Sequence, residues 1–402
     1  WSTLYNLVCQ ATGLGLTHNI KDCYKTILRV YEPGDRIYLF GFSRGAYTVR
    51  CLAAVLHYCG IPTKSPDGRP LRKDPKTLEA IATEAVEKIY QHVGYEKKKP
   101  KDDLSPARED RFASQRIVLG ERFRSKYASG IAYPHFIGVF DTVASVANYA
   151  SMAISFALGI GLSATLAFAF HLWIGGFWWW LFGIILTTSA VGLIYFFKTH
   201  LKVAFGLNNH PWWSTVHLNP IRMKFYDKTL NINVGWARHA LAIDEHRKDF
   251  DRVPWGSMTQ TRQVKSGEPA WLKQWWFAGN HADIGGGYPE TESRLSDAAL
   301  EWMAAEAQSI PDPLIVDGSV LRPYPSPRGM QHDETQSLVF KYASKIDRKI
   351  DPEAELHSLV YERLALPVVL HLFEDKPYRP ENLRAHIKAS EHFTSSTTIA
   401  PQ

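Results

Sequence analysis

The 402-residue chain has no aspartate, glutamate, lysine or arginine between Thr142 and Phe197. Charged residues make up about a quarter of the remaining sequence, the usual proportion for a water-soluble globular domain. This composition excludes an intrinsically disordered chain, a collagen-like chain and a transporter with many spans. It predicts a water-soluble body that carries one uncharged insert.

Cysteine is scarce, and the familiar metal and nucleotide motifs are missing. The four cysteines form no C-x-x-C pair and no H-E-x-x-H segment occurs, so we predict no metal centre, although Asp283 stays open as an isolated ligand. No Gly-Lys-Ser or Gly-Lys-Thr follows the glycines at 285–287, which makes a nucleotide role improbable. The net charge of +6 has no dominant basic stripe and predicts no nucleic-acid partner. We therefore expect no cofactor.

Two apolar runs, residues 152–170 and 177–197, occupy the uncharged insert. Each is long enough to cross a bilayer core, which needs about 20 helical residues. Gly175 and Gly176 lie between the runs and favour a tight reversal. We therefore predict a transmembrane helical hairpin whose reversal lies at the membrane–water interface, where tryptophan is enriched. The tryptophans at this reversal are Trp173, Trp178, Trp179 and Trp180.

Two other structures stay open for this insert, a buried helical pair in a soluble core and a shallow re-entrant hairpin. Soluble core helices seldom run past about 14 apolar residues, which favours the membrane. Lys198 and Lys202 follow the second run. By the positive-inside rule they place the soluble body on the cytoplasmic side of the membrane.

A nucleophile-elbow pattern occupies the segment that follows a turn signal at 32–35. Residues 36–40 are β-branched and aromatic and predict a buried strand, GFSRG follows at 41–45, and residues 46–56 have helical apolar spacing. In this context the serine lies exposed on a sharp turn, where side chains larger than those of Gly41 and Gly45 would strike the flanking elements. Ser43 is therefore the candidate nucleophile, with a structural tight turn as the alternative.

A nucleophilic serine needs a base, and the base needs a carboxylate that orients it; on this fold the chain order is serine, acid, histidine. Residues 135–140 predict a second strand, and Asp141 follows its end. Residues 274–277 predict a third strand, which leads into a glycine-rich loop that holds His281. Both residues fit the order, and for each a structural role stays open. The rival acids are Asp244 and Asp283, and the rival bases are His239 and His246.

Several blocks of the sequence occur together in an order that is typical of a known family. They are ATGLGL at 11–16, YLFGFSRGAYTVR at 38–50, GVFDTV at 138–143, RHALAIDE at 238–245, GNHADIGGGY at 279–288 and LSDAALEWM at 295–303. These blocks resemble an uncharacterised α/β-hydrolase-like family that includes the phospholipase effectors of type VI secretion. The resemblance covers about residues 1–310, interrupted by the hairpin. It implies an α/β fold, an α/β-hydrolase-like sheet with flanking helices.

Carried over by position, the resemblance implies Ser43 as the nucleophile, Asp141 as the acid and His281 as the base. The backbone N–H of Arg44, the residue after the nucleophile, would supply one donor of an oxyanion hole. Family members begin with a strand and an Asp-Gly-Thr-type loop that are expected to help form this hole, and the present sequence starts after them. The second donor is therefore not visible in the sequence.

These observations divide the chain into four predicted segments. Residues 1–148 and 203–310 form the α/β-hydrolase core, with the elbow in the first part and the catalytic histidine in the second. Residues 149–202 form the inserted transmembrane hairpin. Residues 311–402 form a C-terminal extension with proline-rich loops and one strand or helix near 366–373, which packs on the body or binds a partner.

The position of the hairpin bears on the substrate. Ten residues separate Asp141 from Met152, and a linker of that length spans at most about 36 Å. Because catalytic loops leave the carboxyl ends of the strands, we expect the active-site face near the bilayer, where lipid is at high effective concentration. Trp212 and Trp213 would rest at the interface or pack in the core. The sequence therefore predicts a membrane-anchored serine hydrolase that cleaves phospholipid acyl esters, a phospholipase of the A type.

Two other functions stay open. One is a non-catalytic membrane-anchored toxin or scaffold with a vestigial elbow, and the other is a serine esterase or thioesterase that acts on a soluble ester. A fluorophosphonate probe separates the first from an enzyme, because only an activated serine is labelled. The expected partners are a phospholipid substrate and the bilayer. The family resemblance adds a secretion apparatus or an immunity protein, and delivery into a target cell.

Overall fold

A computed structural model describes residues 14–93, 111–143, 149–207, 210–218, 229–250, 252–253, 255, 262–336, 344–371 and 374–394. The chain forms two compact units. The first consists of residues 1–32, 54–132 and 146–226, and the second of residues 33–53, 133–145 and 227–402. The domain boundaries expected from the sequence stay a prediction.

A four-stranded parallel sheet forms the centre of the second unit. Its strands, in spatial order, are β1 (Tyr38–Phe42), β2 (Phe136–Phe140), β5 (Trp236–Ala242) and β6 (Leu272–Phe277). All residues of β5 are buried, as expected for an inner parallel strand that is covered on both faces. The predicted α/β class with a parallel sheet and helices is confirmed, while its α/β-hydrolase character stays a prediction.

Three of these strands were expected from the sequence, and their ends differ. β1 begins two residues later than predicted and continues to Phe42, so Gly41 belongs to the strand. β5 was not predicted, because Arg238 and His239 interrupt its apolar sequence. Arg238 is nevertheless fully buried, since its Nε donates to the Glu306 carboxylate at 2.5 Å. The ion pair compensates the buried charge of Arg238. The sequence pattern of the strand alone would place such a charge at the protein surface.

Helices cover both faces of this sheet. α10 (Arg294–Gln308) packs in the buried cluster that contains Ala240, and α11 (Ser358–Ala365) contributes Val360 to a second cluster that contains Leu241. Because successive side chains of a strand point to opposite faces, the two clusters lie on opposite sides of the sheet. Residues from the C-terminal part of the chain therefore complete the core of this unit.

Apart from α3, the other described elements of the second unit are short. A strand forms inside the region 366–373, where the sequence left strand or helix open, and it pairs antiparallel with the next strand. α3 begins in this unit, directly after the serine of the elbow. The elements are α3 (Arg44–Cys59), η2 (Lys248–Phe250), α9 (His281–Gly285), η3 (Glu290–Glu292), η4 (Glu334–Gln336), β7 (Val369–His371), β8 (Glu374–Lys376), η5 (Glu381–Leu383) and α12 (Glu391–Thr394).

The first unit is mainly helical. Asp74 caps α4 by accepting the Thr77 N–H at 3.0 Å, and Pro75 occupies the first helical position, where its fixed φ suits the helix. α2 and α4 pack together, and α5 packs on the π-helical turn η1. The elements are α2 (Leu14–Val30), α4 (Pro75–Thr83), η1 (Glu84–Tyr90), α5 (Arg111–Tyr127), β3 (Leu201–Lys202), α8 (Trp212–Thr215) and β4 (His217–Leu218).

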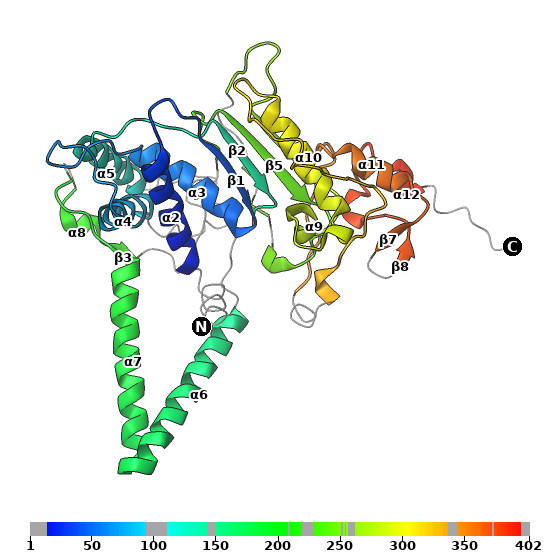
Figure 1. The fold of residues 1–402 in the computed structure, drawn as a ribbon. Helices are drawn as coiled ribbons and strands as arrows, with labels where there is room; N and C mark the ends of the chain where they lie inside the picture. The colour runs from blue at the N-terminus through cyan, green and yellow to red at the C-terminus, as the bar shows by residue number, and fades with distance from the viewer. Residues whose placement is uncertain are drawn as a thin grey trace. The chain divides into compact units, whose positions relative to one another are not determined.

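The insert is a pair of long helices, α6 (Tyr149–Ile174) and α7 (Phe177–His200), which diverge from a turn at two glycines (Figure 1). Gly175 and Gly176 have φ angles of 79° and 72°, a conformation that other residues rarely adopt. Beside the turn, Phe170 stacks on Trp180 with ring centroids 4.8 Å apart. The predicted helical hairpin is therefore present.

Of the described helices, α7 alone is long and apolar enough to cross a membrane; the described apolar part of α6 covers Gly159–Ile174 and is shorter. None of the α7 span is buried, so the alternative of a buried core pair does not hold for this helix. At the reversal, Trp173, Trp178 and Trp179 are exposed by 89%, 76% and 82%, whereas Trp180 is partly covered by Phe170. Insertion into a membrane stays a prediction.

A second group of aromatic side chains is exposed beyond the hairpin. Trp212 and Trp213 of α8 are 52% and 66% exposed. Core packing, which the sequence left open for these two residues, is therefore not observed. A position at the membrane interface remains the prediction for them.

Candidate active site

Ser43 lies on a sharp turn between β1 and α3, in the second unit. Its φ of 57° is in the left-handed region, which is unfavourable for a residue with a Cβ. The turn is held because the Ser43 N–H donates to the Phe140 carbonyl at 3.1 Å. A Cβ on Gly41 would overlap the Gly45 carbonyl and lie 2.6 Å from the Ala46 nitrogen. The strand–turn–helix geometry of a nucleophile elbow is therefore present around this serine.

The two glycines of the motif differ in what surrounds them. A Cβ on Gly45 would meet no described atom within 4 Å. The steric reason that we expected for both glycines therefore applies to Gly41 and not to Gly45. Arg44 is the first residue of α3, and the first N–H groups of a helix have no partner within the helix. The backbone at the start of α3 can therefore offer a donor to an anion.

Asp141 and His281 form a direct pair in the same unit. The Nδ1 of His281 lies 2.6 Å from Oδ2 of Asp141, and both side chains are buried. Asp141 follows β2 with a φ of 39°, and its N–H donates to the Ala240 carbonyl at 2.7 Å. Its Oδ1 accepts the Ala242 N–H at 3.0 Å. The ends of two neighbouring strands thus fix the carboxylate that meets the histidine.

The charge of Asp141 is held by Arg348. The guanidinium donates to Oδ1 at 2.5 Å and to Oδ2 at 3.0 Å, and it is 1% exposed. Burial alone would raise the pKa of Asp141, but Arg348 and the hydrogen bond with His281 outweigh burial and hold that pKa well below its usual range. Sequence reasoning missed Arg348, because it lies 207 residues from Asp141 and in no motif.

The imidazole of His281 is held from several sides. Its ring lies against the rings of Phe42 and Phe250, with centroids 4.6 Å and 5.2 Å away. Its backbone N–H donates to Glu245 at 3.3 Å. Its Nε2 is buried and has no hydrogen-bond partner among the described residues, so no bond joins it to the hydroxyl of Ser43. Such bonds are often long in unliganded enzymes and tighten only when substrate binds.

The rival acids are committed to other partners. Asp283 accepts from His332 Nδ1 at 2.7 Å and from the Asn280 N–H at 3.0 Å, which completes a capping box at the start of α9. Asp244 accepts the Gly279 N–H at 2.7 Å and the Tyr378 hydroxyl at 2.9 Å. Burial raises the pKa of both carboxyls. Both therefore hold the loop that carries the histidine rather than pair with it.

The rival bases hold other partners. The Nε2 of His239 accepts the Thr142 N–H at 3.2 Å and its Nδ1 lies 3.3 Å from the Gln274 amide oxygen. Burial lowers the pKa of His239 to about 3, which keeps the ring neutral. His246 is partly exposed and pairs with Asp347 at 2.8 Å. The structure therefore pairs Asp141 with His281 and neither rival base.

The glycine run after His281 serves packing. A Cβ on Gly285 would overlap the ring of Phe42, the residue before the serine. Gly286, with a φ of 78°, ends α9. Among the described residues no cluster of histidine, cysteine and carboxylate side chains could hold a metal. Both carboxylate oxygens of Asp283 accept hydrogen bonds from protein groups.

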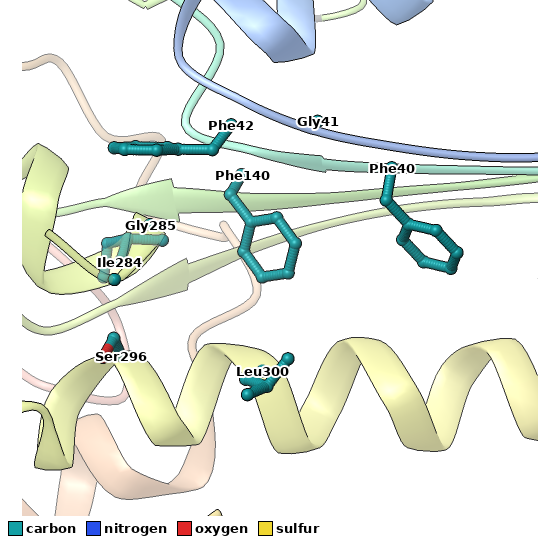
Figure 2. A pocket seen from close by; sticks show the side chains of 9 residues that line it. Phe40, Gly41, Phe42, Phe140, Ile284, Gly285, Ser296 and Leu300 are labelled. Carbon is teal, nitrogen blue, oxygen red and sulfur yellow. The ribbon is translucent and has the colours of Figure 1, made fainter. Parts of the chain in front are cut away.

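An apolar groove of about 300 Å³ opens beside the elbow (Figure 2). Phe42 and Ile284 lie at one end of the groove and Phe40 at the other, with Phe140 between them. Leu300 of α10 faces these rings from the opposite wall. All lining residues belong to the second unit. The groove thus begins at the residues that flank Ser43 and His281 in sequence.

The chain is similar to one known protein family and to a yeast protein. The family model described as "T6SS, Phospholipase effector Tle1-like, catalytic domain" matches residues 1–173 and 181–306. The uncharacterized protein YEL023C of Saccharomyces cerevisiae is 32% identical over 146 residues, which are 36% of this chain and 18% of that protein. The chain therefore spans less than a fifth of the length of this curated relative. No solved structure matches the chain.

Proposed function

The chain belongs to the Tle1-like phospholipase effector family of type VI secretion, and we propose that it is a membrane-anchored serine phospholipase of the A type. The observation that carries the proposal is the 2.6 Å contact between Asp141 and His281 in the unit that presents Ser43 on a strained turn. A nucleophile, a base and an orienting carboxylate in this chain order are the components of acyl-transfer catalysis.

In the proposed mechanism Ser43 attacks the ester carbonyl while His281 Nε2 takes the hydroxyl proton. Asp141 holds Nδ1 protonated, so that Nε2 is the free acceptor. The backbone N–H of Arg44 stabilises the oxyanion. The proton then passes to the departing lysophospholipid oxygen, which leaves an acyl-enzyme. Water then gives a proton to His281 and attacks the acyl carbonyl, and His281 returns that proton to Oγ of Ser43 as the fatty acid leaves.

The hairpin supplies the membrane part of the proposal. α7 is apolar over its length and unburied, and its 24 residues are about 36 Å long, which exceeds a hydrocarbon core of about 30 Å. A hydrolase that is anchored in lipid meets its substrate at high effective concentration. The phospholipid bilayer is then both the site of attachment and the substrate. Membership of an effector family supports delivery into a target cell, where this membrane would lie.

The test is the release of fatty acid and lysolipid from phospholipid vesicles, measured by mass spectrometry. We expect the wild-type protein to release both products and Ser43→Ala to release neither. Ser319→Ala, which changes a serine on a loop at 317–320, is the matched control and should retain full activity. The isomer of the lysolipid identifies the ester bond that is cleaved.

The same assay separates the alternatives. Hydrolysis of a soluble short-chain ester or thioester without vesicle hydrolysis would replace the phospholipase with a soluble esterase or thioesterase. No hydrolysis of any ester, with no labelling of Ser43 by a fluorophosphonate, would leave a non-catalytic anchored toxin or scaffold.

A further inference from the structure

The apolar groove exposes hydrophobic side chains beside a polar site. Phe40 is 41% exposed and Leu300 is 39% exposed, and they lie on opposite walls of the groove (Figure 2). Exposed large apolar side chains that gather in a concavity are typical of a ligand site. Ser296 contributes a hydroxyl group to the wall of the groove. This hydroxyl donates a hydrogen bond to the Ser293 carbonyl at 2.8 Å. The wall therefore suits a hydrocarbon better than a head group.

The groove also has a defined origin and a limited size. Its near end is formed by Phe42 and Ile284, which lie one residue before Ser43 and three residues after His281. A volume of about 300 Å³ is at the lower end of ligand pockets. It suits part of one hydrocarbon chain rather than a lipid with both chains.

We propose that this groove holds the acyl chain of the ester that Ser43 attacks, and that it sets the preferred chain length. The inference rests on the proposed function, because the acyl carbonyl must reach the serine. The acyl chain would extend from the ester carbonyl beside Phe42 and run between β1 and α10 towards Phe40. The groove is an acyl subsite for a fatty ester.

Leu300→Trp tests the assignment by filling the groove from the α10 side. We measure kcat/KM for p-nitrophenyl esters from acetate to palmitate. Because one methylene in an apolar pocket is worth about tenfold or more in kcat/KM, the variant should lose at least about tenfold on long chains. Acetate has no acyl chain beyond its methyl group, so its hydrolysis should fall much less than that of the long-chain esters. Ile315→Trp, at a loop position that is 94% exposed, is the matched control.

A second variant guards against misfolding. Leu300→Ala widens the groove and should move the optimum to longer chains. An unchanged chain-length profile in both variants overturns the acyl subsite while hydrolysis itself persists. Absence of Ser43-dependent hydrolysis at every chain length in the wild type overturns the proposed function instead, and the acyl assignment with it.

A different observation concerns Arg348, which lies beyond the last residue that the family model matches. Besides its two bonds to Asp141, it donates to the Ala242 carbonyl at 3.0 Å and to the Phe250 carbonyl at 2.7 Å. These bonds fix the guanidinium plane, and a bidentate contact fixes the carboxylate plane against it. The carboxylate can then present Oδ2 to His281 in one orientation only.

We infer that Arg348 is a positioning residue of the proposed triad and acts through Asp141. The inference rests on the proposed function. The titratable and charged groups around the pair are His239 of β5, Glu245 with its partner Arg247, and Arg348 itself. Arg348 is the group that contacts both carboxylate oxygens. Without it, the pKa of the buried Asp141 carboxyl would rise.

Two substitutions separate positioning from bulk stability. Arg348→Gln removes the charge, and Arg348→Lys keeps it without the bidentate fork. We expect Arg348→Gln to lower kcat about a hundredfold at unchanged KM, because a misplaced catalytic group costs about that much. The acidic limb of its kcat/KM profile should also move to higher pH. Arg348→Lys should keep the acidic limb of the kcat/KM profile at its wild-type pH. Its kcat should lie between those of Arg348→Gln and the wild type.

The assays use folded protein, checked by circular dichroism and thermal melting. A wild-type kcat and pH profile in both variants would overturn the positioning role. A loss of activity only in proportion to the loss of folded protein would also overturn it, and would leave Arg348 as a structural residue. A wild-type protein without Ser43-dependent hydrolysis is the separate failure of the proposed function.

Discussion

Charged side chains are usually exposed and apolar side chains are usually buried. The sheet end departs from the first rule and the hairpin from the second. At the sheet end, Asp141, His281 and Arg348 are charged or titratable and nearly fully buried, and Asp141 contacts both of the others. In the hairpin, Trp173 and Trp179 are apolar and almost fully exposed. Buried polar groups need partners inside the protein, whereas exposed apolar surface indicates a partner outside it. We therefore propose catalysis at the first region and a membrane contact at the second.

The largest expected effect tests the buried side of this comparison. His281→Gln removes the proposed base and should lower kcat on a soluble ester about 10⁴-fold, because loss of a working triad histidine costs at least that much. Steady-state kinetics provides the measurement. The matched control is His246→Gln, a partly exposed rival base that pairs with Asp347, and it should stay within about twofold. Equal losses in both variants would contradict the assignment.

The next effect tests the exposed side. Ile185→Lys with Leu186→Lys places two charges in the middle of α7, where each charge disfavours insertion by about 3 kcal/mol. The protein should leave the membrane fraction, and vesicle hydrolysis should fall about a hundredfold through lost effective concentration. Hydrolysis of a soluble ester should not change. Ile315→Lys, at an exposed apolar position outside the hairpin, is the control, and a protein that stays in the membrane after the double change contradicts the anchor.

How much the sequence predicted follows from the same comparison. Ser43, Asp141 and His281 could be located because each follows a strand in a short segment with its own local pattern. The hairpin could be predicted because the absence of charge is a property of the segment alone. Arg348 could not be found, since its role comes from a contact made across 207 residues. β5 was missed because the polar residues Arg238 and His239 interrupt its apolar sequence, although both side chains are buried.

A smaller effect distinguishes the two glycines of the elbow. Gly41→Ala forces its Cβ into the backbone of α3 and should destabilise the protein by about 2 kcal/mol or more, as overpacking does. Gly45→Ala has open space and should stabilise the first turn of α3 by up to about 1 kcal/mol. Urea unfolding measures both. Equal destabilisation by the two changes would show that the turn is not the one described.

The smallest effect concerns the histidine that supports the catalytic loop. Burial would lower the pKa of His332, but hydrogen bonds to Asp283 and Glu292 outweigh burial and raise it. A raised pKa contributes stability below the unfolded value of about 6.5 and loses it as pH rises through the folded value. The melting temperature of the wild type should therefore exceed that of His332→Gln at pH 6 and approach it above pH 8. A pH-independent difference would contradict this assignment.

The central claim is that a buried pair of Asp141 and His281 activates Ser43. Its most direct measurement is labelling with a fluorophosphonate probe, followed by mass spectrometry of the labelled peptide. We predict that the wild-type protein carries the label on Ser43 and that His281→Gln loses it, while His246→Gln keeps it. A folded wild-type protein that is unlabelled, or labelled at another residue, would contradict the account.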